Sequence, residues 1–284
     1  MIVPAYNEAA VIKRTLAPLS RAAVDGIIEL IVVCNGCADD TAEVARSVPG
    51  AQVIELQQGS KPAALNAGDE VATVWPRLYL DADIQISDAA AIAVLDRLAQ
   101  GDVLAARPTC RYDTDGASAL VRSFYRARVR IPQHKHAMWG AGVYGLNAKG
   151  HQRLGVFPMI TADDGYVDSR FVADEKAVVA TEPAVVTTPA DTKSLLSILR
   201  RCRRGKAEIS TGALGSEAGT QTTSLASAAE LLRAIRGPQS AIDTAVYIGM
   251  AFAKRWPARQ IQAWERDESS RSSRDSRPRS DGIG

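Results

Sequence analysis

Two pairs of carboxylates stand where they could bind a cation or move a proton. Asp81 and Asp83 follow the apolar run Leu78–Leu80, and residues two apart in an extended chain project to the same side. This spacing suits Mg²⁺ or Mn²⁺, which takes one or two protein carboxylates and completes its shell with water and phosphate oxygens. A solvated loop that caps the next helix is the simpler interpretation. Asp163 and Asp164 fit either acids in the first turn of a helix or a general base.

Lys61 is a candidate for binding phosphate. It precedes Pro62, a residue that suits the first turn of a helix, so its ammonium would lie beside unpaired backbone N–H groups. An ordinary solvated lysine is the other interpretation.

Cys34 and Cys37 have the spacing of a redox pair. They stand between a predicted strand and a predicted helix, and a helix N-terminus lowers the pKa of a thiol. Structural zinc is disfavoured, because it needs four ligands and the sequence has no second close Cys or His pair of suitable spacing. His134 and His136 could contact one ligand, although a polar loop is the simpler interpretation.

Alternating strands and helices are needed to position these residues, and the apolar pattern predicts them. We expect strands at 1–5, 27–33, 52–56, 77–80 and 102–106, and helices at 8–19, 41–48, 62–73 and 89–99. Asp40 with Glu43 fits a cap for the helix that begins at Thr41. The alternation predicts an α/β protein with a mostly parallel sheet and helices on both faces, because parallel neighbours need crossover connections. Ligands of such a sheet bind beyond the carboxyl ends of its strands, here at the loops 4–8, 34–40, 59–61 and 81–83.

The second half of the chain is less regular. Its apolar pattern predicts a loop at 108–116, a basic helix at 117–130 and a loop at 132–139. A strand at 142–146 and a short helix at 163–172 follow. Beyond them we expect two β-rich runs within 177–188, separated by Pro183, and helices from Thr192. Two amphipathic helices are predicted within 227–264, divided at Gly237-Pro238. We therefore expect a main domain over 1–206, a helical extension over 207–264 and a disordered tail rich in Ser, Arg and Asp over 265–284.

Composition excludes several classes of protein. The 284 residues carry 34 basic and 32 acidic side chains, for a net charge of +2, and 46% are apolar. These values are typical of a globular protein and argue against disorder, collagen-like repeats and binding to nucleic acid. Four cysteines do not form a disulfide framework, and no export signal or spanning segment is apparent. The expected location is the cytoplasm.

Six short motifs occur in the order found in family 2 glycosyltransferases, and the chain resembles this family over residues 1 to about 206. The motifs are Ile2–Glu8, Val32–Thr41, Lys61–Asn66, Leu80–Asp83, Gly140–Gly142 and Asp163-Asp164. The resemblance implies a GT-A fold and an inverting transfer of a sugar from a nucleotide-diphosphate sugar to an acceptor hydroxyl, with Mn²⁺ or Mg²⁺.

The resemblance also implies roles for individual residues. Asp164 would be the catalytic base, and Asp81 and Asp83 would bind the metal. The implied substrate-binding residues are Pro4, Ala5, Tyr6, Glu8, Asn35, Asp39, Lys61, Asp81, Ala82, Gly140, Ala141, Gly142, Asp163, Arg201 and Arg204. The last two belong to a basic segment that resembles the family's late arginine motif without the tryptophan of processive members, so we expect non-processive transfer.

Other expectations stay open at this stage. Cys34 and Asn35 replace the acidic residue that the family often presents to the base, so the nucleotide is not defined, and neither are the sugar and the acceptor, which could be lipid, glycan or protein. A catalytically silent nucleotide-sugar binding protein is the alternative function, and a redox role for Cys34 and Cys37 is a third. Residues 238–262, apolar with basic flanks, could contact an anionic membrane surface peripherally, on the inner face of the cell membrane, or pack against the main domain.

Overall fold

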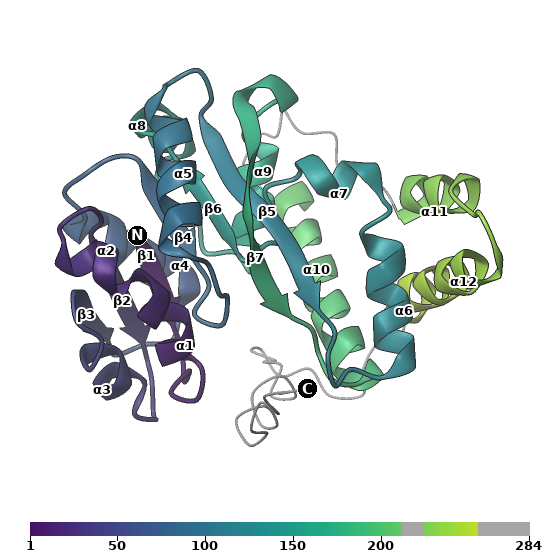
Figure 1. Ribbon diagram of the computed structural model, residues 1–284, viewed down its shortest axis with the longest axis horizontal. Helices are drawn as coiled ribbons and strands as arrows, with labels where there is room; N and C mark the ends of the chain where they lie inside the picture. Colours follow the sequence, from purple (N-terminus) through teal and green to yellow (C-terminus); the bar gives the residue numbers. More distant parts are fainter. Residues whose placement is uncertain (212–223, 255–284) are drawn as a thin grey trace, which may run out of the picture.

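The computed structural model describes residues 1–211 and 224–254. Its centre is a seven-stranded sheet of order β3-β2-β1-β4-β6-β5-β7 (Figure 1). The strands are β1 (Ile2–Ala5), β2 (Leu30–Asn35), β3 (Ala51–Leu56), β4 (Arg77–Leu80), β5 (Ala105–Asp113), β6 (Val143–Leu146) and β7 (Lys176–Thr187). Among the strands of the described residues, only β6 is antiparallel to its neighbours, β4 and β5. The sequence-based prediction of a mostly parallel α/β fold is confirmed.

Helices cover both faces of this sheet (Figure 1). The helices of the described residues are α1 (Ile12–Leu16), α2 (Ser20–Val24), α3 (Thr41–Arg46), α4 (Lys61–Val71), α5 (Asp88–Ala99), α6 (Ala119–Arg128), α7 (Pro132–His136), α8 (Ala148–Leu154), α9 (Asp163–Ser169), α10 (Thr192–Thr211), α11 (Ser224–Arg233) and α12 (Pro238–Ala253), with short 3-10 turns at Ala17–Leu19 and Ala173–Glu175. Of these, α11 and α12 lie away from the sheet, beside α6 (Figure 1).

Alternation of side chains along the strands divides the core into two layers. Val3 of β1 packs in the layer that includes α1, α3 and α5, whereas its neighbour Ile2 packs with Leu65 of α4 and Tyr166 of α9. Every residue of β2 is buried, as expected for a parallel strand covered on both sides. This packing fixes the direction in which the carboxyl ends of β1, β2 and β4 point.

Several sequence-based boundaries were wrong, and the strands expected at 27–33 and 102–106 begin only at Leu30 and Ala105. The expected loop at 108–116 is largely strand, because β5 continues to Asp113 beside β7. The two expected β-rich runs form one strand, β7, in which Pro183 is tolerated because this strand lies at the sheet edge. The helix expected over 8–19 begins only at Ile12 and passes into a 3-10 turn at Ala17. The expected loop 132–139 contains the short helix α7.

The C-terminal helices pack beside α6. Tyr247 of α12 stacks on Phe124 of α6 at 5.0 Å between ring centroids, and Asp243 accepts hydrogen bonds from Ser123 and Arg126. Helix α10 runs across residue 206, the expected domain boundary. None of the helices in the described ranges is long and apolar enough to cross a membrane. The expected tail, 265–284, and residues 255–262 of the expected membrane contact lie outside the described residues.

Candidate active site

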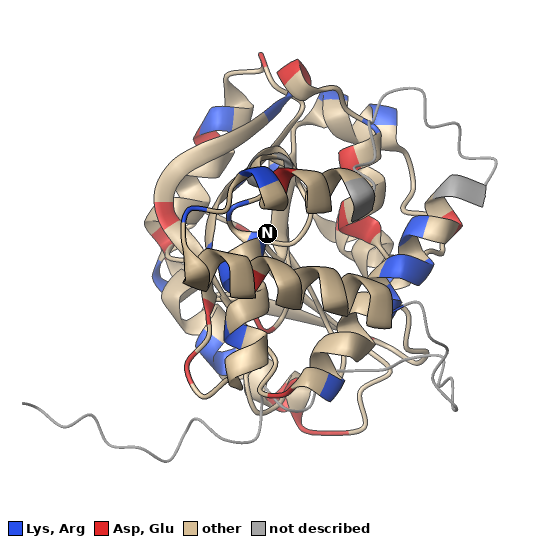
Figure 2. Cartoon of the chain, turned by 90° about the vertical axis from the view of Figure 1, so that its right-hand side faces the viewer, with Lys and Arg blue, Asp and Glu red and all other residues tan. Residues whose placement is uncertain are grey.

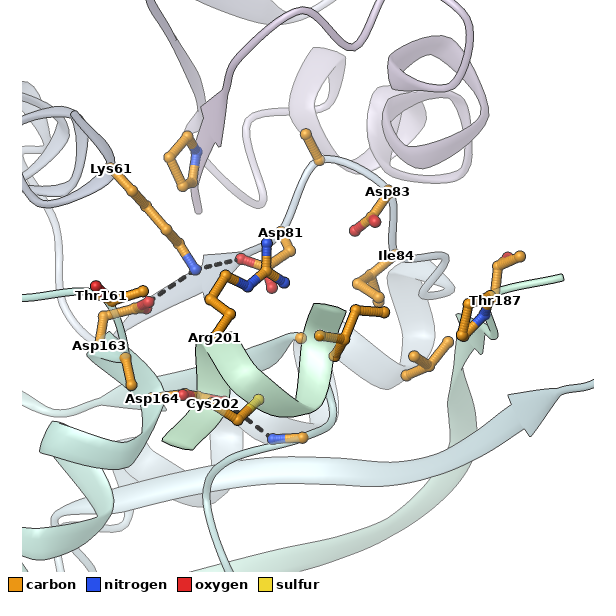
Figure 3. A pocket seen from close by; sticks show the side chains of 18 of the residues that line it. Lys61, Asp81, Asp83, Ile84, Thr161, Asp163, Asp164, Thr187, Arg201 and Cys202 are labelled. Atoms are coloured by element: carbon orange, nitrogen blue, oxygen red, sulfur yellow. Dashed lines mark hydrogen bonds and ion pairs between the residues drawn. The ribbon is translucent and has the colours of Figure 1, made fainter. Parts of the chain in front are cut away.

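One pocket of about 360 Å³ lies beyond the carboxyl ends of β1, β2 and β4 (Figure 3). The N-termini of α4 and α9 and one side of α10 complete its wall. The residues of the pocket that had been singled out from the sequence are Pro4, Tyr6, Glu8, Asn35, Lys61, Asp81, Ala82, Asp83, Gly140, Gly142, Asp163, Asp164, Arg201 and Arg204. The fold thus gathers residues of all six motifs, and of the basic segment of α10, around one cavity.

Lys61 joins the two acidic pairs. Its Nζ lies 2.6 Å from Oδ1 of Asp81 and 2.8 Å from Oδ1 of Asp163. The lysine is held in place because Ser60 caps α4, accepting a hydrogen bond from the N–H of Ala63. Tyr144 donates a hydrogen bond to the other oxygen of Asp163, at 2.8 Å. Asp163 is therefore a buried structural member of the pair, with 4% of its surface exposed.

Charges inside the pocket shift one another's pKa. Burial disfavours the ammonium of Lys61, but Asp163 and Asp81 outweigh this effect and raise its pKa. Burial raises the pKa of Asp81 to about 6, with Asp163 and Asp83 adding to the rise and Lys61 opposing it. Asp81 and Asp83 are thus close enough to repel each other.

That repulsion provides a test of whether the site fits a divalent cation. A bound Mg²⁺ or Mn²⁺ would offset the charges of Asp81 and Asp83, and carboxylate oxygens are ligands of the right hardness. Oδ2 of Asp81, the oxygen that does not bind Lys61, lies 3.4 Å from the position that a Cβ on Gly142 would occupy. Among the residues that the structure describes, no group of three His, Cys, Asp or Glu side chains is arranged to hold a metal. A cation held by Asp81 and Asp83 would therefore take its remaining ligands from phosphate and water.

Asp164 lies in the same pocket, at the start of α9. Its Oδ2 accepts a hydrogen bond from the N–H of Gly140 at 3.0 Å, and its Oδ1 accepts one from Gly165 at 2.7 Å. Burial and the neighbouring Asp163 raise the pKa of Asp164, against the opposite effects of Lys61 and of these two hydrogen bonds. A fixed carboxylate with a raised pKa is suited to accept a proton.

Three of the expected site residues, Ala5, Asp39 and Ala141, do not line the pocket. Ala5 is buried in β1, where its carbonyl accepts a hydrogen bond from the amide of Asn35 at 2.7 Å. Ala141 is fully buried between two pocket glycines. Asp39 accepts a hydrogen bond from the N–H of Thr41 at 3.1 Å. The capping role that the sequence indicated for Asp40 was therefore wrong, because Asp40 makes no such bond and Asp39 does.

The structure is unfavourable to a redox pair. Cys34 is 1% exposed, and burial, with Cys37 adding to it, raises the pKa of its thiol to about 12. A reactive cysteine needs the opposite shift. His134 takes up no proton at neutral pH, since burial and the charges of Arg128 and Lys206 lower its pKa to about 3.

An aromatic wall of the pocket was missed from the sequence. Tyr112, Phe124, Tyr125 and Arg128 come from β5 and α6. The signal in the sequence was the basic helix expected at 117–130, but nothing in it indicated that this helix faces the pocket. The direction in which it faces is set by its packing on α12.

Comparison with known proteins defines the class. The family model for glycosyl transferase family 2 matches residues 1–143, half of the chain, and the chain belongs to this family. A search of curated protein sequences gave no match. The GT-A fold is shown by solved structures.

Three of these structures are similar over most of their length. A mannosyltransferase from Pyrobaculum calidifontis, solved with GDP-Man and Mn²⁺, has a TM-score of 0.55 and 20% identity, covering 90% of this chain and 86% of the other. Glucosyl-3-phosphoglycerate synthase from Mycobacterium tuberculosis, solved with Mn²⁺, UDP and phosphoglyceric acid, has a TM-score of 0.51 and 20% identity, covering 71% of this chain and 77% of the other. TarS 1-349 from S. aureus, solved with UDP, has a TM-score of 0.50 and 14% identity, covering 89% of this chain and 71% of the other.

Removal of Lys61 should show how strongly the protein depends on its ion pairs with Asp81 and Asp163. We expect Lys61→Met to lower the free energy of unfolding by about 2–3 kcal/mol at pH 8, because two buried carboxylates lose their shared cation. The loss should shrink at pH 5. Without the lysine, the pKa of Asp81 rises further above its unfolded value, so the destabilisation is present above that raised pKa and disappears as the pH falls below it. Urea unfolding at both pH values measures this effect. Lys13→Met, at an exposed position of α1, is the matched control, and an equal loss in both variants at both pH values would refute the electrostatic account.

Proposed function

We propose that this protein transfers a sugar from a nucleotide-diphosphate sugar to an acceptor hydroxyl, by a single displacement that inverts the anomeric carbon. The observation that carries the proposal is the meeting of Asp164 with Asp81, Asp83 and Lys61 in one pocket. The family and the fold support a glycosyltransferase, and the pocket supplies groups for both halves of the reaction. A hexosyl group and non-processive transfer are the forms of this reaction that the motifs favour.

The donor side of the pocket is formed by the loops after β1, β2 and β4. We assign the nucleotide to the region of Pro4, Tyr6 and Asn35, which line the pocket. Asp81 and Asp83 would hold Mn²⁺ or Mg²⁺, whose charge would stabilise the departing diphosphate. Two of the structural neighbours were solved with Mn²⁺ and a nucleotide, which supports this assignment.

Asp164 performs the proton transfer in this proposal. The acceptor oxygen bonds to the anomeric carbon while the bond from that carbon to the diphosphate oxygen breaks. The hydroxyl proton passes to Asp164, and the nucleoside diphosphate leaves with the bonding electron pair. The hydrogen bonds from Gly140 and Gly165 fix the orientation of the carboxylate, and each of its oxygens has a further lone pair for the acceptor.

Titration calorimetry with UDP and GDP, each with and without Mn²⁺, tests the donor half of the proposal. We expect one of the two nucleotides to bind, and Mn²⁺ to strengthen its binding. If neither nucleotide binds under either condition, the proposed donor site is wrong. A silent binding protein is the second candidate, and it would bind the nucleotide sugar without releasing nucleoside diphosphate on addition of any acceptor.

The domain organisation is also part of this proposal. We assign catalysis to residues 1–206, which contain the carboxylates and the basic segment of α10, and we assign 207–264 to a helical extension. The extension packs on α6, a helix that contributes to the pocket wall, so the two regions support one another.

We further propose that α11 and α12 rest peripherally on an anionic lipid surface. Leu232, Ile242 and Phe252 expose 55%, 56% and 53% of their surface, and basic residues flank them at Arg233 and Lys254. Figure 2 looks onto this side of the molecule, where Lys and Arg are scattered among long uncharged stretches. Apolar side chains with basic flanks match the chemistry of an interfacial helix.

Co-sedimentation with lipid vesicles measures this contact. We expect the double variant Ile242→Glu, Phe252→Glu to bind vesicles of phosphatidylcholine and phosphatidylglycerol about ten-fold or more weakly than the unmodified chain, because two apolar side chains that would enter the lipid are lost. Val156→Glu, an exposed apolar position directly after α8, should bind normally. Equal binding by all three proteins would show that α11 and α12 do not contact lipid, and their exposed apolar side chains would then bind another partner.

A further inference from the structure

Arg128 lies beside the proposed catalytic base and has no role in the mechanism above. It is the last residue of α6 and lines the pocket. A Cβ on Gly140 would come within 2.6 Å of its Nη2, so the guanidinium rests against the backbone of Gly140. The N–H of this same residue binds Asp164 at 3.0 Å. The positive charge is therefore one residue away from the carboxylate that would receive the proton.

The partners of Arg128 are neutral. Its Nε donates a hydrogen bond to the hydroxyl of Tyr112 at 3.1 Å, and its guanidinium carbon lies 5.5 Å and 5.3 Å from the ring centroids of Tyr112 and Trp139. Within the part of the chain that the structure describes, no carboxylate forms an ion pair with it. A guanidinium held by aromatic rings keeps its fork of N–H donors available for a carboxylate or phosphate.

The surroundings add positive charge. Lys206 lies over the same Trp139 ring, with its Nζ at 5.2 Å from the centroid. Burial and the charge of Arg128 lower the pKa of Lys206, and both cations depress the pKa of His134. Like charges gathered in this way are costly unless an anion joins them. Asp164 and Asp168 act on Lys206 in the opposite direction, and Lys61 pairs with Asp81 and Asp163 at the donor side, so a further anion would be stabilised chiefly by Arg128.

Apolar side chains adjoin Arg128 on the same wall. Tyr112, Phe124, Tyr125 and Leu199 pack together in one cluster, and all four line the pocket. The ring centroids of Tyr112 and Tyr125 are 4.8 Å apart. This side of the pocket therefore offers a cation next to an aromatic and aliphatic surface, a combination that fits a molecule with an anionic group and an apolar part.

We propose that the acceptor is such a molecule, and that Arg128 binds its anionic group, of the phosphate type, while the aromatic cluster contacts its apolar part. This inference rests on the proposed function, since it assigns the acceptor side of that site. The anion would hold the acceptor hydroxyl near Asp164. The chemistry is that of a phosphate monoester, whether on an alkyl chain or on a smaller polar molecule, and the contacts with Phe124 and Leu199 favour the alkyl chain.

Binding of octyl phosphate tests the proposal, measured by calorimetry on the full chain saturated with Mn²⁺ and the nucleoside diphosphate that it binds. We expect octyl phosphate to bind better than both inorganic phosphate and octyl glucoside. Arg128→Gln should weaken its binding by about ten-fold or more, because a hydrogen bond to a charged group is lost. Arg122→Gln, an exposed position of the same helix, makes the same change of charge and should bind as the unmodified chain does.

The outcomes separate this inference from the proposed function. If octyl phosphate binds equally to the unmodified chain and to Arg128→Gln, the inference is wrong even when nucleotide binding is normal. If Arg128→Gln instead loses affinity for the nucleoside diphosphate, Arg128 belongs to the donor side and the inference is again wrong. Inorganic phosphate that binds as tightly as octyl phosphate would refute the apolar contact. Failure of the unmodified chain to bind either nucleotide would refute the proposed function itself. A thermal unfolding curve of each variant confirms that it is folded.

Discussion

Asp164→Asn is expected to lower the rate of sugar transfer by about 10²- to 10⁴-fold, the contribution of a positioned general base. The amide can still accept hydrogen bonds from Gly140 and Gly165 through its carbonyl oxygen, but it cannot take the proton of the acceptor. Binding of the donor should change little, because the donor side is formed by Lys61, Asp81 and Asp83. Steady-state transfer and nucleotide titration, performed on the same preparation, measure the two quantities.

The pH dependence gives this prediction a second readout. Asp164 must be ionised to act as a base, so kcat/KM should rise with pH through the pKa of this group. Because burial and Asp163 raise that pKa, the acid limb should lie above the range of an ordinary aspartate, near 3.8. Asp174→Asn, at an exposed position of a 3-10 turn, should leave unchanged both the rate of transfer and the position of the acid limb of the pH profile. Near-normal transfer by Asp164→Asn would remove Asp164 from the mechanism.

Asp83→Asn is expected to remove the effect of Mn²⁺ on nucleotide binding and to reduce transfer by about 10²-fold or more. The substitution keeps the size of the side chain and removes one of the two charges that would hold the cation. Loss of a preorganised electrostatic contact to the leaving group costs on the order of 10²- to 10³-fold in other enzymes. Titration with the nucleotide at several Mn²⁺ concentrations measures the first effect and transfer assays measure the second.

The matched control is Asp96→Asn, an exposed acid on α5, which should bind the nucleotide with the same dependence on Mn²⁺ as the unmodified chain. Treatment of the unmodified chain with EDTA should reproduce the behaviour of Asp83→Asn. If Asp83→Asn retains full stimulation by Mn²⁺, the cation is held elsewhere.

Much of the site could be predicted because it depends on local order along the chain. The apolar runs that became β1, β2 and β4 are short, continuous and followed directly by polar residues, so the loops that carry Asn35, Asp81 and Asp83 had to meet at one edge of a parallel sheet. Lys61 followed from the same reasoning, since it begins the helix after β3. The residue pattern left Asp163 and Asp164 open between acids of a first helical turn and a general base, and the family resemblance singled out Asp164.

The remainder depends on contacts between distant parts of the chain. Pro108 indicates a loop when read alone, yet β5 continues past it because β7 provides a pairing partner on its outer side. Arg128 and Phe124 could be placed on a helix but not in the pocket, because their direction is set by the packing of α6 on α12. The cap of α3 illustrates the same limit on a smaller scale, since the choice between Asp39 and Asp40 depends on backbone angles.

Release of nucleoside diphosphate tests the account most directly. The unmodified chain is incubated with Mn²⁺ and a panel of UDP- and GDP-linked sugars, with and without candidate acceptors, beside Asp164→Asn. We predict that at least one donor releases its diphosphate, that an acceptor bearing a phosphate and an apolar chain accelerates the release, and that Asp164→Asn loses this acceleration while it still binds the donor. Release that proceeds equally in both proteins, or that no acceptor and no donor can elicit, would contradict the assignment of this pocket to sugar transfer.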